Sequence, residues 1–114
     1  MTITSGTIHE PVAGEGFKSD LAIAPGEILL DEFLKPLGLS QRALAVAIGV
    51  PPIRISEILH AKRAISPDTA LRFSAFFGTT PEFWMNLQSS YDLTLVRLAN
   101  RSRYSQIKPL TLTA

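Results

Sequence analysis

The chain has 114 residues, 46% of them hydrophobic, which is enough apolar material for the core of a single domain. It contains no cysteine, which excludes disulfide bonds and thiolate metal sites and suits a reducing compartment. A net charge of +1 does not by itself indicate a nucleic-acid partner, so only a local basic patch would indicate one.

Charge is distributed unevenly along the chain. Residues 1–24 carry one lysine against three acids, for −2, and residues 25–95 carry six basic against seven acidic residues, for −1. Residues 96–114 carry four basic residues and no acid, for +4. The chain shows no signal-peptide pattern at its start and no apolar run near the ~20 residues of a membrane span. We therefore expect a soluble, unprocessed cytoplasmic protein with a basic tail and no membrane partner.

The first predicted elements are a flexible arm and a helix. Residues 1–24 mix threonine, glycine and serine with single apolar residues and show no period, which predicts a flexible N-terminal arm. From Pro25 a helical pattern begins, and Gly38 closes it. Its predicted apolar stripe consists of Leu29, Leu30, Phe33, Leu34 and Leu37.

Two short helices follow in close succession. Ser40 is a good N-cap for the second helix, and Gly49 suits a left-handed position at its end. Pro51 and Pro52 suit the start of a third helix, which runs to about His60. The predicted inward positions are Leu44, Ala45, Ile48, Ile55, Ile58 and Leu59. The short connection between the two helices predicts a helix-turn-helix.

Two further helices complete the pattern. Ser66 and Pro67 start the fourth, which Gly78 terminates, and Thr80 starts a long fifth helix whose end we expect near Asn100. The prediction is an all-α, compact five-helix domain over residues 25–95, with a flexible arm before it and a basic C-terminal extension, residues 96–114, after it.

The third helix has a polar outward edge. On a helical wheel, Ile55 and Ile58 point inward. The positions on the outward side are Ile53, Ser56, Glu57 and His60, with Arg54 on the flank. A DNA major groove admits one α-helix and is read by the exposed side of that helix. The two prolines would fix the helix start at the groove.

Each outward residue has a second interpretation. Arg54 contacts a phosphate or guanine, or is a solvated surface arginine. Glu57 accepts from cytosine N4 or orients a neighbouring arginine, or it forms a surface salt bridge. Ile53 meets a thymine methyl group or packs on protein, and His60 reads a base or is a neutral surface histidine. The prediction for the helix is therefore stronger than that for any one of its residues.

Basic and polar residues flank this helix. Gln41 and Arg42 lie in the first turn of the second helix, where free N–H groups and the helix dipole attract a phosphate. Lys62 and Arg63 follow the third helix, and residues 52–63 carry a net charge of +2. This is a local basic patch that the net charge of the chain conceals.

Residues 25–93, about 60% of the chain, resemble a known family. The segments "PGEIL", "LSQRALA", "RISEI", "DTALR" and "PEFWMNLQ" are together specific. They resemble the HigA-like antitoxins, also called virulence-associated protein I, of the phage-repressor-type helix-turn-helix class. The resemblance implies a small helical dimer that binds double-stranded operator DNA upstream of its own operon. It also implies that the protein neutralises a partner toxin, an mRNA-cleaving ribonuclease of the RelE type.

The resemblance also implies which residues contact DNA. They are Gln41, Arg42, Pro52, Ile53, Arg54, Ser56, Glu57 and His60, with Lys62 and Arg63 on the DNA backbone. Four positions depart from the family pattern. Pro52 and Ile53 stand where polar residues are common and cannot form a bidentate base contact, Ser56 replaces a common asparagine, and Ala61 replaces a usual glycine.

The leading hypothesis is a homodimeric antitoxin that represses its own operon. One module contacts too few bases for selective binding, so two copies on half-sites about one helical turn apart are expected. The candidates for the dimer seam are Trp84, Leu87, Tyr91 and Leu95 on the fifth helix, and core packing is the alternative for Trp84.

Two other functions remain open: a stand-alone transcriptional regulator, and a toxin-binding module whose third helix no longer reads DNA, which Pro52 and Ile53 motivate. An enzyme is the weakest interpretation. The two histidines, His9 and His60, are far apart in sequence, and neither a metal-ligand spacing nor a glycine-rich phosphate loop occurs. We expect no catalytic residue, no metal and no cofactor.

Overall fold

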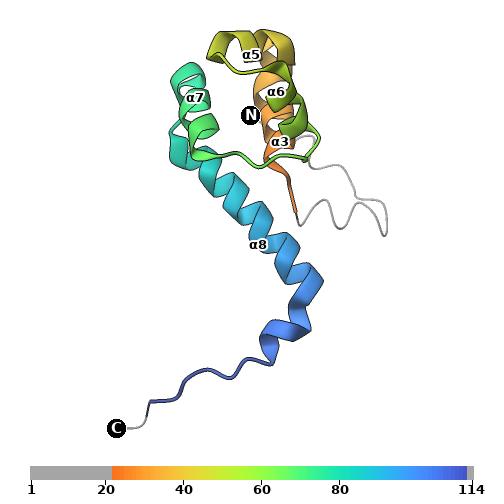
Figure 1. The fold of residues 1–114 in the computed structure, drawn as a ribbon, viewed down its shortest axis with the longest axis vertical. Coiled ribbons are helices and arrows are strands. Elements are labelled where there is room, and N and C mark those ends of the chain that lie inside the picture. The colour runs from red at the N-terminus through yellow and green to blue at the C-terminus, as the bar shows by residue number, and fades with distance from the viewer. Residues whose placement is uncertain (1–21, 113–114) are drawn as a thin grey trace.

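The computed structural model describes residues 22–112, and these form no strand. Its elements are α3 (Pro25–Ile28), η1 (Leu29–Leu34), α4 (Lys35–Leu37), α5 (Gln41–Ile48), α6 (Pro52–Leu59), α7 (Pro67–Phe77) and α8 (Pro81–Ser105). Because α3, η1 and α4 follow one another without a break, residues 22–112 form five helical segments, and the predicted all-α class is confirmed (Figure 1). None of the described helices is long and apolar enough to cross a membrane. Most of the predicted arm, residues 1–21, lies outside the described part.

The first helical segment contains a π-helical turn, η1, which the sequence did not predict. Lys35 N–H donates to the carbonyl of Leu30 five residues earlier, and this wider turn rotates the following residues around the axis. The predicted apolar stripe was partly wrong, since Leu30 and Leu37 are exposed. Pro36 follows the turn, and in a regular α-helix its ring would crowd the carbonyl four residues earlier.

The helix-turn-helix forms as its end signals predict. Ala43 N–H donates to Ser40 Oγ at 3.0 Å, which caps α5. Gly49 has a φ of 73°, and Val50 N–H donates to the Ala45 carbonyl at 3.0 Å, closing a Schellman turn. Pro52 occupies the first position of α6, where a missing N–H leaves no helical bond unmade.

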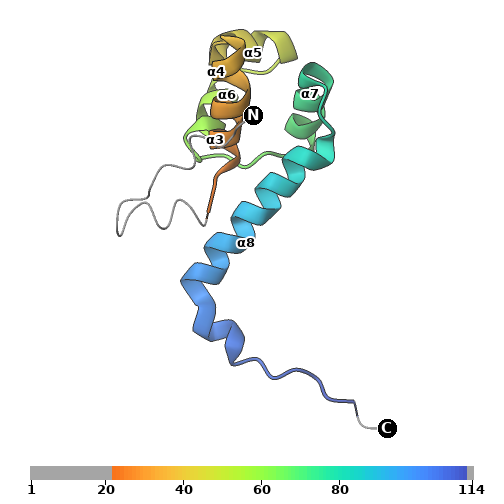
Figure 2. The ribbon, with the colours of Figure 1, turned by 180° about the vertical axis from the view of Figure 1, so that it is seen from behind.

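The fifth helix is longer than its sequence indicated. Thr80 Oγ1 accepts from Phe83 N–H at 3.1 Å and caps α8, which continues to Ser105. Asn100, the predicted end, has non-helical angles of φ −130° and ψ 30°, so the helix is kinked there and then resumes. Residues 96–105 of the predicted extension are therefore helical. Figures 1 and 2 both show α8 leading away from the body that α3 to α7 form.

The core lies between the helix-turn-helix, the first helical segment, α7 and the start of α8. Its buried members are Leu29, Leu34, Leu44, Ala45, Ile48, Val50, Ile55, Ile58, Ile65, Ala70, Phe73 and Trp84. Trp84 has no exposed surface; its ring lies 4.9 Å from that of Phe73, and its Nε1 donates to Thr79 Oγ1 at 2.7 Å. The prediction that Trp84 lies in a dimer seam is therefore wrong, because the side chain packs inside its own subunit.

The backbone of helix α3 packs directly against the backbone at the end of α6. A Cβ on Gly26 would overlap the carbonyl oxygen of Ile58 and come within 2.9 Å of the Leu59 Cα. Only glycine permits this approach. Ala22 and Ala24 are also buried, so the packed part of the chain includes residues 22–24, which the sequence analysis assigned to the arm.

Candidate nucleic-acid interface

Helix α6 presents one side to the core and the other to solvent, as the helical wheel predicted. Ile55 and Ile58 are 0% and 1% exposed, whereas Ile53 is 57% exposed. Pro52 and His60 lie on the solvent side, and Ser56 and Glu57 are half-buried. The outward edge is therefore free to meet a partner along its length, beginning at its first turn.

Two of the outward side chains make local contacts. Glu57 Oε1 accepts from Arg63 Nε at 2.8 Å and lies 2.7 Å from Arg63 Nη2. His60 Nδ1 lies 2.8 Å from the carbonyl oxygen of Ser56. Glu57 thus forms the salt bridge that was one of its two interpretations, and this bridge holds Arg63 against the end of α6.

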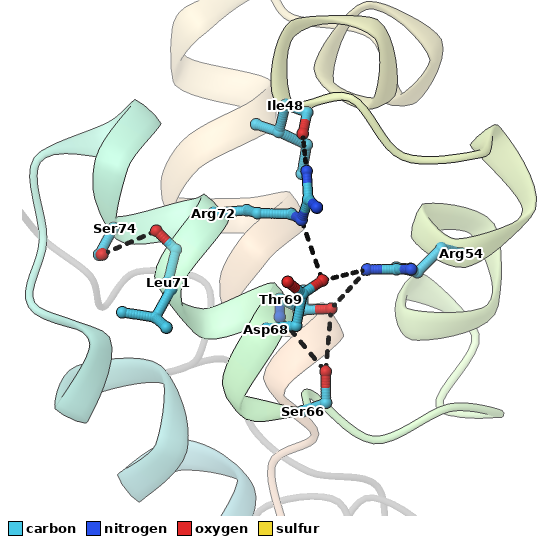
Figure 3. A network of polar contacts seen from close by, with 8 residues as sticks. All are labelled: Ile48, Arg54, Ser66, Asp68, Thr69, Leu71, Arg72 and Ser74. Atoms are coloured by element: carbon cyan, nitrogen blue, oxygen red, sulfur yellow. Dashed lines mark hydrogen bonds and ion pairs between the residues drawn. The ribbon is translucent and has the colours of Figure 1, made fainter.

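Arg54 is tied to the start of α7 (Figure 3). Its Nη1 donates to Asp68 Oδ2 at 2.8 Å and to Thr69 Oγ1 at 3.4 Å. The Arg54 side chain is 27% exposed, so it is neither a solvated surface arginine nor a buried one. It lies on the flank of α6 with its guanidinium group held by another helix.

The same carboxylate oxygen binds a second arginine. Arg72 Nε donates to Asp68 Oδ2 at 2.9 Å, and Arg72 Nη1 donates to the Ile48 carbonyl at 2.7 Å. The last carbonyls of a helix have no partner within the helix, so Arg72 satisfies one at the end of α5. The hydrogen bonds from Arg54 and then from Arg72 hold the pKa of the Asp68 carboxyl below its ordinary value.

Asp68 and Arg72 were not among the predicted site residues. Both stand in the segment "DTALR", which carries part of the family resemblance. A spacing of four residues places an acid and an arginine on one helix face, so their mutual pairing is readable from the sequence. The contacts to Arg54 and Ile48 span 14 and 24 residues, and no local pattern signals them.

The two flanks of the helix-turn-helix are solvent-accessible. Gln41 and Arg42 are exposed in the first turn of α5, and Lys62 and Arg63 are exposed after α6. Ala61, which directly precedes Lys62, has a φ of 57° and occupies the left-handed position that ends α6. Lys62 N–H donates to the Glu57 carbonyl at 2.7 Å, so this turn closes like the one at the end of α5.

Comparison with known proteins identifies the family. Residues 30–84 match the model of a helix-turn-helix family. The chain is 49% identical over 81 residues to virulence-associated protein I of Dichelobacter nodosus, covering 71% of this chain and 75% of the relative. It is 36% identical over 88 residues to antitoxin HigA-1 of Vibrio cholerae, covering 77% and 83%. The chain belongs to the HigA-like helix-turn-helix antitoxin family.

A solved structure extends the comparison to three dimensions. The structure of Pseudomonas aeruginosa antitoxin HigA with the higBA promoter matches with a TM-score of 0.75 and 43% identity. The match covers 78% of this chain and 98% of that one. The HigA-like fold is therefore shared over nearly the whole of the neighbour and over most of this chain.

One buried polar residue of this HigA-like chain holds the connection that follows the helix-turn-helix, and the sequence did not predict it. Gln88 on α8 is 8% exposed. Its Oε1 accepts from Ile65 N–H at 2.8 Å, and its Nε2 donates to Asp92 Oδ1 at 2.9 Å. Gln88 thereby fixes the connection between α6 and α7 to α8, and a polar residue in a helical sequence carries no signal of such a distant bond.

Proposed function

We propose that this HigA-like chain is the antitoxin of a type II toxin–antitoxin system. It binds operator DNA as a dimer to repress its own operon, and it neutralises an mRNA-cleaving toxin of the RelE type. Its site of action is the cytoplasm, where operator DNA lies. The observation that supports this most strongly is the match to antitoxin HigA with its promoter, together with an accessible outward edge on α6.

The outward edge of α6 is proposed to enter the major groove. Ile53 is exposed near its start and offers an apolar contact for a thymine methyl group. Pro52, Ser56, Glu57 and His60 complete the edge. Because Glu57 is paired with Arg63, we assign it the role of orienting that arginine toward the DNA backbone.

The flanks are proposed to contact phosphates. Gln41 and Arg42 lie where the N–H groups of the first turn of α5 and the positive end of the helix dipole favour an anion. Lys62 and Arg63 provide a second cationic contact beyond α6, and Arg54 provides one on its flank. Such contacts set the position of the module on DNA, and the groove-facing edge supplies selectivity.

The test uses DNA from upstream of the gene that encodes the chain. Arg42→Ala and Arg54→Ala should each weaken operator binding and reduce the slope of log affinity against log salt by about 0.9 for each phosphate that the variant no longer neutralises. The matched control is Arg103→Ala, which removes the same charge from the last turn of α8, away from the helix-turn-helix (Figure 1). Unchanged slopes for Arg42→Ala and Arg54→Ala, with a reduced slope for Arg103→Ala, would move the docking surface to the tail.

Toxin neutralisation requires a separate experiment. The chain is co-expressed with a RelE-type ribonuclease encoded by an adjacent gene; a stable complex and loss of mRNA cleavage are expected. Operator binding without such a complex would indicate a stand-alone regulator.

The exposed, apolar Pro52 and Ile53 favour one second candidate, a toxin-binding module that does not read DNA. For that candidate the complex forms, while no mobility shift of upstream DNA occurs even at low salt.

A further inference from the structure

We propose that Asp68 is a positioning residue for operator binding: its carboxylate holds Arg54 at the flank of α6, and Arg72 in turn holds the carboxylate. The inference rests on the proposed function and deepens it, since it assigns a role in DNA binding to residues that need not touch DNA. It concerns four groups that Figure 3 shows in one view: the Ile48 carbonyl, Arg72, Asp68 and Arg54.

The four groups form a continuous chain of contacts. Ile48 O accepts from Arg72 Nη1 at 2.7 Å, and Arg72 Nε donates to Asp68 Oδ2 at 2.9 Å. The same oxygen accepts from Arg54 Nη1 at 2.8 Å. The first group lies at the end of α5 and the last on α6, so α7 clamps both helices of the helix-turn-helix. The turn between them and the Arg54 side chain are thereby fixed relative to each other.

The contacts leave part of Arg54 available. A guanidinium group has five N–H donors, and in residues 22–112 those of Arg54 that make hydrogen bonds are on Nη1. Nε and Nη2 have no protein acceptor in that part of the chain. Asp68 therefore holds the group by one nitrogen and leaves a donor pair for a phosphate oxygen. A side chain held before binding loses less conformational entropy when it binds.

Charge alone predicts the opposite effect of removing Asp68. Together Arg54, Arg72 and Asp68 carry a net charge of +1, and loss of the carboxylate charge would raise it to +2. A more positive surface attracts DNA more strongly whatever its sequence. If Asp68 positions Arg54, however, its loss should weaken operator binding although the surface becomes more positive. The sign of the change therefore separates the two explanations.

The chain contains a matched control for this substitution. Asp68 follows Ser66 and Pro67 in the first turn of α7, and Glu82 follows Thr80 and Pro81 at the same place in α8. Both are exposed. Within residues 22–112, Glu82 takes part in no ion pair, whereas Asp68 takes part in two. Glu82→Gln thus removes an equivalent helix-start charge without releasing an arginine.

The experiment compares the full chain with Asp68→Asn and Glu82→Gln on operator DNA and on random-sequence DNA of the same length, with folding checked by circular dichroism. Asp68→Asn should weaken operator binding roughly two- to tenfold, the factor expected when one freed side chain must be ordered on binding. Its affinity for random DNA should stay level or rise. Glu82→Gln should leave the operator-to-random ratio unchanged, and Asp68→Asn in an Arg54→Ala background should cause no further loss.

A second variant keeps the test independent of the folding of Asp68→Asn. Arg72→Lys preserves the charge and leaves the residues Asp68 and Arg54 unsubstituted. A single ammonium group, however, cannot reproduce the two directed contacts of Arg72, so the Asp68 carboxylate is no longer held as in the native chain. It should also lower the operator-to-random ratio.

The outcomes separate this inference from the proposed function. If the native chain binds operator selectively and both variants keep its ratio, or lose affinity equally for both DNAs, the positioning role is wrong while the proposed function stands. If the native chain shows no selective binding, both fail.

Discussion

Ala61 is the one non-glycine residue with a positive φ in the part of the chain that the structure describes. A left-handed conformation costs an L-residue with a side chain about 1–2 kcal/mol, and the extra backbone entropy of glycine offsets about 0.5–1 kcal/mol of the gain. Ala61 is exposed, so its methyl group contributes little packing. We expect Ala61→Gly to raise the free energy of unfolding by about 0.5–1 kcal/mol in urea denaturation.

Ala64→Gly is the control for this substitution. Ala64 is exposed in the same connection, but its φ is not positive. Glycine there removes no strain and adds unfolded-state entropy, so no stabilisation is expected. An Ala61→Gly protein that is no more stable than Ala64→Gly would show that the left-handed turn at the end of α6 carries no cost.

The ion pairs of Asp68 predict how the stability of the protein depends on pH. A carboxyl whose pKa is lowered by folding stabilises the protein above its unfolded pKa, near 3.8, and this contribution is lost as pH falls through the lower folded value. At neutral pH Asp68→Asn should therefore be less stable than the native chain, and the difference should shrink below about pH 4. Chemical denaturation at a series of pH values measures it, and a difference independent of pH would contradict the assignment.

Glu27 has the opposite effect on the pH dependence of stability, but it does not affect the comparison between the native chain and Asp68→Asn. Burial first, and then repulsion from Asp31, raise the pKa of Glu27, so its contribution is present at low pH and is lost as pH rises through the raised value. Both proteins carry Glu27 unchanged. Its effect therefore cancels in the difference between native chain and variant.

At the scale of elements, the orientation of α6 can be tested with two isoleucines that lie two residues apart on opposite sides of the helix. Ile55 has no exposed surface, so Ile55→Ala should cost about 2–5 kcal/mol of unfolding free energy. Ile53 is 57% exposed, so Ile53→Ala should change stability by less than about 0.5 kcal/mol. If the proposed function is right, Ile53→Ala should still lower operator affinity, because Ile53 lies on the edge proposed to enter the major groove. Equal losses of stability for the two would mean that the helix is rotated.

Helix starts and ends were the elements most readable from sequence. Ser40, Ser66 and Thr80 each accept an N–H bond from three residues later, and Gly38, Gly49 and Gly78 each take a left-handed φ at a helix end. These are local effects, in which a side chain and the adjacent backbone decide the conformation. The order of the helical segments followed from them, and the inward side of α6 followed from the spacing of Ile55 and Ile58.

What the sequence did not reveal depends on an irregular helical turn in one case and on contacts between elements in the others. The first helical segment contains the π-helical turn η1, and Leu30 and Leu37 of its predicted stripe are exposed although their spacing is regular. The clamp at Asp68 joins helices far apart in sequence. For Trp84 the sequence left a dimer seam and core packing open, and only the packing of α7 against α8 decided between them. In the last two cases the deciding contact is made with another helix, which a periodic pattern does not show.

At the scale of the whole molecule, α8 carries exposed apolar residues beyond the core. It leads away from the body, and Leu93, Leu95 and Val96 are 49%, 37% and 44% exposed. Leu87 and Tyr91 are half-buried, and with Leu95 they follow one another at four-residue spacing along one side. A symmetric dimer through this side would pair the same residues of two copies and carry two copies of α6 on one operator.

The dimer seam that we propose can be tested at two leucines on opposite sides of α8. Leu95→Asp places a charge on the side of Leu87 and Tyr91, and burying an unpaired charge in an interface is costly. We expect it to shift the chain toward monomer in sedimentation equilibrium and to weaken operator binding with it, because a monomer holds one half-site. Leu93→Asp, on the opposite side, should leave the assembly intact. If Leu93→Asp rather than Leu95→Asp disrupts the dimer, the seam lies on the other side of α8, along Met85 and Val96. The two copies of α6 would then have a different orientation relative to each other.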